Sequence, residues 1–394
     1  MVRKHLAVYP YTIDDETAAF IASHYDLVDF DFIATEGIEK VKTLNPNIIM
    51  VGYREITFID TYLEDWAEVN LHEDWFLHDI NGNRLKNADY DSYAMDVGNP
   101  EWRDHQAQLV KAKLNERPWA DGVFADSVFD RRTLDSNIFT VDPSLVPSSV
   151  KERWNTDIKG MLQYVKSVIG TKLLIINNTD FTGDFLSVAD GMMLEGFIHG
   201  SWNGLYEYES EDYMLRLLDT IERLSFTGKY FMAQSDTGFP TAPTDSDLQQ
   251  AHKIMLYCLG SFLLGTNGSK ATFGWLSLHG AVRRGVPYHY PEMDIDVGNP
   301  TGSRTQVNAD VWTRDFSKAK VFVNFSATNT YPVTVDGLVY TLPPHSSVIA
   351  PWEAPPIAPT IFDRAWSAFE EFSGRLNLPV PPKPAQPPKL PIEG

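Results

Sequence analysis

The feature that most constrains the fold of this chain is an alternation of short apolar runs with longer amphipathic stretches over residues 1–284. Strands alternating with helices predict a parallel sheet. Eight such strands favour an α/β fold with a closed (β/α)8 TIM barrel, although an open doubly wound sheet remains the alternative. No G-x-G-x-x-G sequence follows any strand, which disfavours that alternative. The eight predicted strands are HLAVYPY (5–11), YDLVDFDF (25–32), NIIMVGY (47–53), GVFADS (122–127), KLLIINN (172–178), GMMLEGF (191–197), KYFMAQS (229–235) and ATFGWLS (271–277).

The amphipathic stretches carry helix start and stop signals, such as a capping residue at one end and a glycine or proline at the other. The interval over 54–121 is the longest between two strands, and long βα loops of a barrel lie at its functional, C-terminal face. It contains an excursion with an Asn-Gly turn signal over 72–85. We expect helices over 12–24, 37–45, 94–115, 149–170, 211–225 and 245–265.

The character of the sequence changes after residue 284, which predicts three further parts. Short strands of period two, separated by turn residues, predict a small antiparallel β-domain over 285–355. Residues 356–378 predict a single C-terminal helix, and 379–394 contain seven prolines and predict an extended tail. That tail could be a linker or an arm that lies along a second copy or an assembly partner.

Composition and charge exclude several classes of function. A net charge of −20 disfavours binding to nucleic acid or to an anionic membrane surface. The single cysteine, Cys258, rules out an intramolecular disulfide and lies in an apolar run, so we expect a buried thiol. No signal-peptide pattern and no apolar run of 18 residues is present, which predicts a soluble protein without fixing its location.

Two carboxylates are the leading catalytic candidates because each follows an apolar strand. Asp126 ends the fourth predicted strand and Glu195 lies near the end of the sixth, and functional residues of a barrel lie at these strand ends. Cleavage of a glycosidic bond needs one group to protonate the leaving oxygen and another to attack the sugar or activate water. Asp126 could instead be a helix cap for the following loop, and Glu195 could form a buried ion pair with Arg54 or another cation. Asp236, after the seventh strand, could replace either carboxylate.

Other polar and aromatic residues at strand ends are candidates for the substrate pocket. High aromatic content, at 12%, suits sugar stacking but equally suits a large core. The histidines lack the spacing of a catalytic metal motif, so we expect no metal and no cofactor, apart from an optional structural Ca²⁺ near the acidic segment 291–296. The candidate substrate-binding residues are Tyr9, Tyr11, Asp31, Tyr53, Arg54, Asn177, Asn178, His199, Trp202, Asp236 and Trp275.

Several of these segments together resemble a family. The segments that carry the resemblance are the opening strands, NPNIIMVGY, HEDWFLHDINGNRL, MDVGNPEWR, GVFADS, MLEGF, and DVGNPTG followed by VWTRDFSKAKVFVNFS. They are similar to glycoside-hydrolase-like barrels, in particular hypothetical glycosyl hydrolase-like family 15. The resemblance spans about residues 5–350. It implies a TIM barrel followed by a small β-domain of the amylase-like kind. It also implies that Asp126 is the nucleophile and Glu195 the acid/base.

The resulting hypothesis is a glycoside hydrolase that acts on a poly- or oligosaccharide by a retaining mechanism. Sequence alone does not choose between retention and inversion, which differ in the separation of the two carboxylates. Two alternatives stay open. One is a barrel that binds glycans without cleaving them, and the other is a structural or virion-type assembly protein that uses its proline-rich arm.

Overall fold

The fold was examined in a computed structural model of the chain. The structure describes residues 2–9, 12–32, 37–177, 184–200, 202–225, 227–237, 244–266, 270–276 and 289–350. Two candidate pocket residues, Tyr11 and Asn178, lie outside the described residues. The predicted C-terminal helix (356–378) and the proline-rich tail (379–394) also lie outside them, so both stay predictions.

The main sheet is the eight-stranded parallel sheet that the sequence predicts. Its strand order is β1-β2-β3-β6-β7-β8-β9-β10, and all eight predicted strands are members of it. The Lys4–Phe273 bridge brings the first strand to the last, so the sheet is a nearly closed barrel. The strands are β1 (His5–Val8), β2 (Leu27–Asp31), β3 (Ile49–Glu55), β6 (Gly122–Asp126), β7 (Leu173–Asn177), β8 (Gly191–Glu195), β9 (Tyr230–Asp236) and β10 (Ala271–Leu276).

The helices also follow the predicted pattern, because their capping signals act locally. Asn99 caps α4 through its side chain and Pro100 occupies the first turn, while Thr244 and Asp247 form a reciprocal capping box on α7. All six predicted helices are therefore present, and a further short one over 66–69 was not predicted. The helices are α1 (Asp15–His24), α2 (Glu39–Leu44), α3 (Trp66–Val69), α4 (Pro100–Glu116), α5 (Ser148–Ile169), α6 (Glu211–Ser225) and α7 (Asp245–Gly265).

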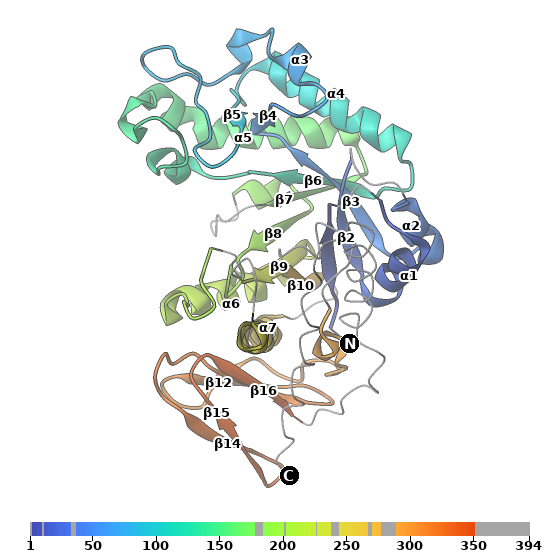
Figure 1. The fold of residues 1–394 in the computed structure, drawn as a ribbon, viewed down its shortest axis with the longest axis vertical. Helices are drawn as coiled ribbons and strands as arrows, with labels where there is room; N and C mark the ends of the chain where they lie inside the picture. Colours follow the sequence, from blue (N-terminus) through green and yellow to red (C-terminus); the bar gives the residue numbers. More distant parts are fainter. Residues whose placement is uncertain are drawn as a thin grey trace, which may run out of the picture. The chain divides into compact units, whose positions relative to one another are not determined.

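The chain divides into two compact units. Unit 1 comprises residues 1–28, 34–48 and 195–394, and unit 2 comprises residues 29–33 and 49–194. In unit 2, α4 and α5 lie side by side (Figure 1). The long interval of unit 2 contains two strands that the sequence pattern missed, β4 (Phe58–Asp60) and β5 (Ser92–Ala94), which pair antiparallel. Three-residue strands are too short to produce a readable period.

Unit 1 includes the small antiparallel β-region that the sequence predicts. The strands β11 (Thr305–Gln306), β12 (Val311–Asp315), β13 (Lys320–Asn324) and β16 (Ser346–Ala350) form one sheet. The strands β14 (Tyr331–Val335) and β15 (Leu338–Leu342) form a hairpin.

Helix α7 joins this β-region to the rest of unit 1, since it contacts β9 and β10 as well as β13 and β16 (Figure 1). Gly260 permits the close approach, because a Cβ there would lie 2.4 Å from the Ser347 side chain. The buried Arg314 guanidinium donates to the carbonyl oxygens of Leu263 (3.2 Å) and Leu264 (3.1 Å) and thereby caps the C-terminal end of α7. Cys258 of this helix is buried, as expected.

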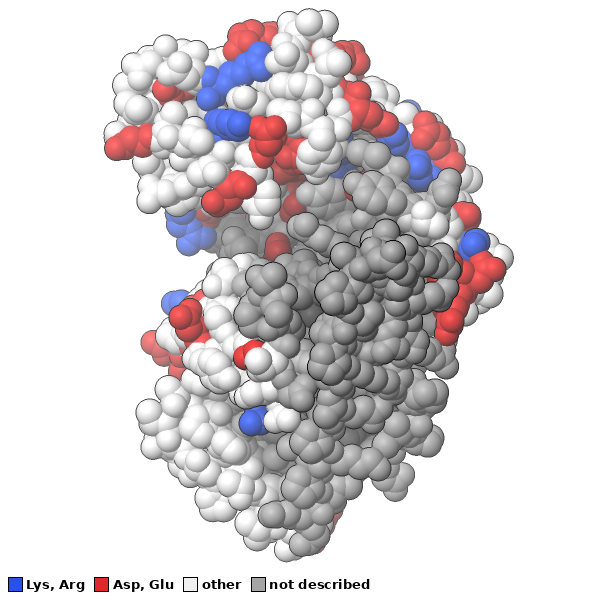
Figure 2. Space-filling view, in the orientation of Figure 1, with Lys and Arg blue, Asp and Glu red and all other residues white. Residues whose placement is uncertain are grey.

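The charged surface of unit 2 mixes both signs despite the acidic composition. Figure 2 shows acidic and basic side chains next to one another over the part that carries α3, β4 and β5. Arg153, for example, pairs with Asp96 (2.7 Å) and Asp157 (2.5 Å). The face of unit 2 seen in Figure 2 therefore carries charges of both signs.

Candidate active site

Asp126 ends β6, where three hydrogen-bond donors hold its carboxylate. The Tyr53 hydroxyl donates to Oδ2 at 2.7 Å, and the Asn177 side-chain amide donates to Oδ1 at 2.9 Å. The Ser127 N–H also donates to Oδ1, at 2.7 Å. Tyr53 and Asn177 lie near or at the ends of β3 and β7, the two neighbours of β6. The structure therefore brings three of the predicted site residues together in unit 2.

The backbone after Asp126 is strained in a way that serves this arrangement. Ser127 has a φ of +60°, which is a left-handed conformation. This conformation costs a residue other than glycine about 1–2 kcal/mol. Its carbonyl accepts the Thr57 hydroxyl at 2.7 Å, and its own hydroxyl donates to Glu55 at 2.8 Å. Strain of this kind is concentrated at functional sites. The alternative role for Asp126 as a helix cap falls instead to Asp130, which caps the next short helix.

Glu55 is a site residue that the sequence reasoning missed. It lies opposite Asp126 in the register of β3 and β6, and it is buried. The pKa of Glu55 is raised to about 8, chiefly by burial. The negative charges of Asp60 and Asp126 act in the same direction. The predicted strand ended at Tyr53, but β3 continues to Glu55, two residues on and on the same face. The period-two alternation could have revealed Glu55.

Arg54 points to the other side of β3, away from Tyr53. Its guanidinium is buried and donates to Gln106 at 2.9 Å and to Asp65 at 2.8 Å. His105 also contacts Asp65, at 2.9 Å. Removing one partner of such a buried pair leaves the other charge uncompensated. Its contacts thus resemble those of a structural residue, and the structure does not bring it to Asp126.

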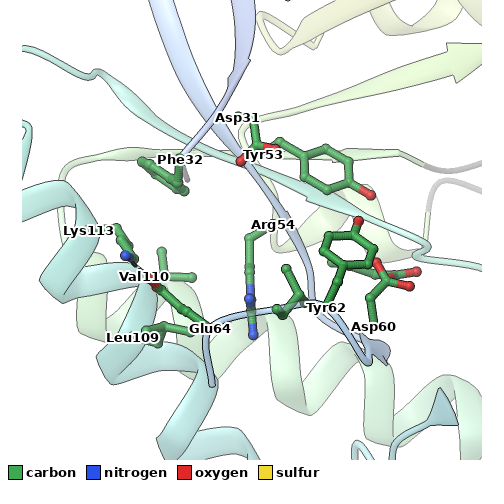
Figure 3. A pocket seen from close by; sticks show the side chains of 12 residues that line it. Asp31, Phe32, Tyr53, Arg54, Asp60, Tyr62, Glu64, Leu109, Val110 and Lys113 are labelled. Carbon is green, nitrogen blue, oxygen red and sulfur yellow. Dashed lines mark ion pairs between the residues drawn. The ribbon is translucent and has the colours of Figure 1, made fainter. Parts of the chain in front are cut away.

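A pocket of unit 2 lies beside the end of β3 and is lined by Tyr53, Arg54 and Glu55 among others (Figure 3). Figure 3 shows Tyr53, Tyr62 and Asp60 gathered on one side and Arg54 running between them and the α4 residues. Burial raises the pKa of Asp60 and of Tyr62. The carboxylates of Glu55 and Asp60 line the pocket, whereas Asp126 is not among its lining residues. The lining residues are Asp31, Phe32, Tyr53, Arg54, Glu55, Asp60, Tyr62, Leu63, Glu64, Leu109, Val110 and Lys113.

Glu195 ends β8 in unit 1, and an exposed tryptophan lies beside it in the chain fold. Gly196 has a φ of +73°, and a Cβ there would come within 2.2 Å of the Trp202 ring. Only glycine therefore allows the Trp202 ring to lie this close to the backbone of the turn after Glu195. The Trp202 side chain keeps 60% of its surface exposed. An exposed aromatic ring that lies against the residue after a candidate carboxylate is a suitable platform for a sugar ring.

Asp236 ends β9 and belongs to the same part of unit 1. Burial raises its pKa to about 8, and the negative charge of Glu195 contributes in the same direction, while the Thr237 N–H, 2.6 Å from Oδ1, opposes them. The Asp236 carboxyl group is therefore protonated at neutral pH. Its backbone carbonyl accepts a hydrogen bond from Nδ1 of the buried His199 at 2.7 Å. His199 thus ties the turn after β8 to the end of β9.

Two further candidates, Trp275 and Tyr9, belong to or contact β10, the neighbour of β9. Trp275 of β10 is buried and packs edge-on against Tyr290. Tyr9 packs against Ala7 and Leu276 at the ends of β1 and β10. Among the described residues, the helices are too short or too polar to cross a lipid bilayer.

Known structures resemble this chain to different extents. The galactosidase domain of the alpha-galactosidase-sucrose kinase AgaSK has a TM-score of 0.50 and 12% identity, covering 88% of this chain and 54% of that one. The maltogenic alpha-amylase AmyB from Thermotoga neapolitana gives 0.49 and 11%, covering 88% and 96%. The glycoside hydrolase domain of PelA from Pseudomonas aeruginosa gives 0.48 and 16%, covering 72% and 97%. At 12% identity, the likeness to the AgaSK domain concerns the fold alone.

The sequence itself matches a family. No curated protein sequence matches the chain. The family described as hypothetical glycosyl hydrolase family 15 matches residues 42–320, which contain β3 to β10, both candidate carboxylates and the first strands of the β-region. This confirms the resemblance seen in the sequence. The chain belongs to hypothetical glycosyl hydrolase family 15.

Proposed function

We propose that this protein is a retaining glycoside hydrolase that cleaves a poly- or oligosaccharide, with Asp126 as nucleophile and Glu195 as acid/base. Membership in a glycosyl hydrolase family supports the reaction class. The observation that carries the assignment of Asp126 is its carboxylate, held at the end of a barrel strand by Tyr53, Asn177 and Ser127. Three donors fix its orientation before substrate binds, as a nucleophile requires.

The strand register supports the choice of Glu195 as the partner of Asp126. Asn177, which donates to Asp126, is the register partner of Met193 on β8. Glu195 is two residues farther along β8, so alternation places it on the same face as Met193. The carboxyl ends of parallel barrel strands form one functional face.

The proposed reaction has two steps. Asp126 attacks the anomeric carbon while Glu195 donates its proton to the departing glycosidic oxygen, giving a covalent glycosyl-enzyme and a free alcohol. Glu195 then removes a proton from water, which attacks the same carbon and releases Asp126. Trp202 would stack against a sugar ring, and Tyr53 would steady the Asp126 carboxylate. Asp236, protonated at neutral pH, is the second candidate for the acid/base role.

The test begins with a panel of oligo- and polysaccharides hydrolysed by the wild-type protein. Asp126→Ala and Glu195→Gln should each abolish hydrolysis, while the far-UV circular dichroism and the binding of the same glycan persist. Azide should restore turnover of an activated glycoside by Asp126→Ala, because the small anion can occupy the space of the missing carboxylate. Wild-type activity in either variant would contradict the assignment.

A further outcome decides between Glu195 and Asp236. If Glu195→Gln keeps most of its activity while Asp236→Asn loses it, the acid/base role belongs to Asp236. If no glycan in the panel is hydrolysed but several bind with equal affinity to wild type and Asp126→Ala, the protein is a glycan-binding barrel instead.

A further inference from the structure

A group of potential metal ligands lies in unit 1, at the end of α1. His24 is the last residue of α1 and precedes β2, and Asp294 ends the 3₁₀ helix η6 (Pro291–Asp294). Among the described residues, His24, His289 and Asp294 form the one group of three whose ligand atoms all lie within 4.8 Å of one another. All three belong to unit 1.

Within the acidic segment 291–296, Asp294 differs from the other two acidic residues in its partners. Glu292 pairs with His252 at 3.1 Å, and Asp296 pairs with Lys318 at the surface. Asp294 instead faces two imidazoles through one oxygen, Oδ2, which lies 3.0 Å from Nδ1 of His24 and 2.9 Å from Nε2 of His289. Two nitrogen ligands do not suit Ca²⁺, which prefers oxygen, but they suit Zn²⁺ and similar ions.

We infer that His24, His289 and Asp294 form a binding site for a divalent transition-metal ion of the zinc class. In a tetrahedral zinc site with bonds of about 2.0–2.1 Å, ligand atoms are roughly 3.4 Å apart. The two nitrogen-to-oxygen distances, 3.0 and 2.9 Å, are close to that separation and need only small side-chain movements. Water can supply the fourth ligand, because the His24 side chain is 32% exposed.

Neighbouring groups hold Asp294 and His289 in place, as second-layer hydrogen-bond partners do in metal sites. Lys4 holds the other carboxylate oxygen of Asp294, Oδ1, at 2.8 Å, which leaves Oδ2 for the ion. The Tyr25 hydroxyl lies 3.2 Å from Nδ1 of His289, where it can accept the proton that this nitrogen carries when Nε2 binds a metal. Outer-shell partners of this kind fix the tautomer and orientation of metal-binding histidines.

The surroundings also favour a cation in two further ways. His24 lies at the C-terminal end of α1, where the helix dipole is negative. Phe20 stacks on His24 at a centroid distance of 4.2 Å and packs edge-on against His289, so an apolar wall limits the motion of both rings. The Lys4 ammonium group opposes the ion, and we therefore expect micromolar rather than nanomolar affinity.

The experiment uses the full chain after treatment with a chelator and removal of that chelator. Co²⁺ is added as a spectroscopic probe, and Zn²⁺ binding is measured by calorimetry. We expect visible d–d absorption at one equivalent of Co²⁺, its loss on addition of Zn²⁺, and a higher melting temperature in Zn²⁺. His24→Gln should lose at least tenfold in affinity and keep the fold, because His24 is partly exposed.

The matched control is His78→Gln, since His78 also pairs with a carboxylate, Glu73 at 2.7 Å, outside this cluster. It should bind as the wild type does. Absence of the cobalt signal, or equal binding by His24→Gln and the wild type, would overturn the inference. Asp126→Ala should bind metal normally, so failure of the glycosidase proposal and failure of the metal site are separate results.

Discussion

Asp126 and Asp236 are the same residue type at the end of two strands of one sheet, yet their surroundings differ. Asp126 accepts hydrogen bonds from Tyr53, Asn177 and Ser127. Asp236 is buried, accepts the Thr237 N–H, and has its pKa raised to about 8. Donors stabilise a carboxylate, whereas burial stabilises the neutral acid. The two aspartates share residue type and strand position, so the difference teaches that their surroundings must be known before a role is proposed for either.

The largest effect we expect separates these two aspartates directly. Asp126→Asn should lower kcat/KM on the order of 10⁴-fold, because loss of a nucleophile removes the whole covalent pathway. Asp236→Asn should lower it by roughly 10²-fold or less, because the neutral amide resembles the protonated carboxyl group. Steady-state kinetics on the hydrolysed glycan measure both. Asp135→Asn, at an exposed surface site, is the control, and equal losses at positions 126 and 236 would break the comparison.

Tyr53→Phe tests whether the donors around Asp126 matter. Removing a hydrogen bond to a charged group is worth about 1.5–3 kcal/mol, which corresponds to roughly a 10- to 150-fold loss of kcat/KM. Tyr164→Phe is a matched control, since the Tyr164 hydroxyl donates to Asp104 at 2.7 Å on the surface. Similar kinetics for Tyr53→Phe and the wild type would show that Tyr53 does not hold the reacting carboxylate.

Trp202→Ala tests the sugar platform beside Glu195. Loss of the exposed ring should raise KM about tenfold, or about 1.4 kcal/mol, with a smaller change in kcat. The melting temperature should stay within a degree or two, because the ring is already 60% exposed. Tyr90→Ala, which removes another exposed aromatic ring, should leave KM unchanged. An unchanged KM for Trp202→Ala would remove this residue from the substrate site.

The smallest effect concerns stability and pH. The folded pKa of Asp236, about 8, is above the ordinary value of 3.8, so between these limits the folded state holds a proton that the unfolded state has lost. Its contribution to the free energy of unfolding therefore falls as pH rises from about 4 to 8. Asp236→Asn lacks this loss, and its melting temperature should rise relative to the wild type over that window. A constant difference between pH 4 and 8 would show that Asp236 is not buried as a neutral acid.

The sequence determined the fold because its signals are local. The eight strand runs require only neighbouring residues, and the structure has all eight. Side-chain caps, which are also local, start α1, α4 and α7, whereas α2 and α5 begin without one. The same argument found Asp126, Glu195 and Asp236, since each follows an apolar run. The predicted boundaries of the barrel and β-domain, by contrast, remain predictions.

Only the tertiary structure decided which side chains meet. That Tyr53 reaches Asp126 while its neighbour Arg54 turns to Asp65 depends on the pairing of β3 with β6 and on the packing of α4. The group at His24, His289 and Asp294 was missed for the same reason, whereas the alternation of β3 could have revealed Glu55. His24 is distant from the other two in the chain, and distances and burial across such separations set the charge state and contacts of each carboxylate.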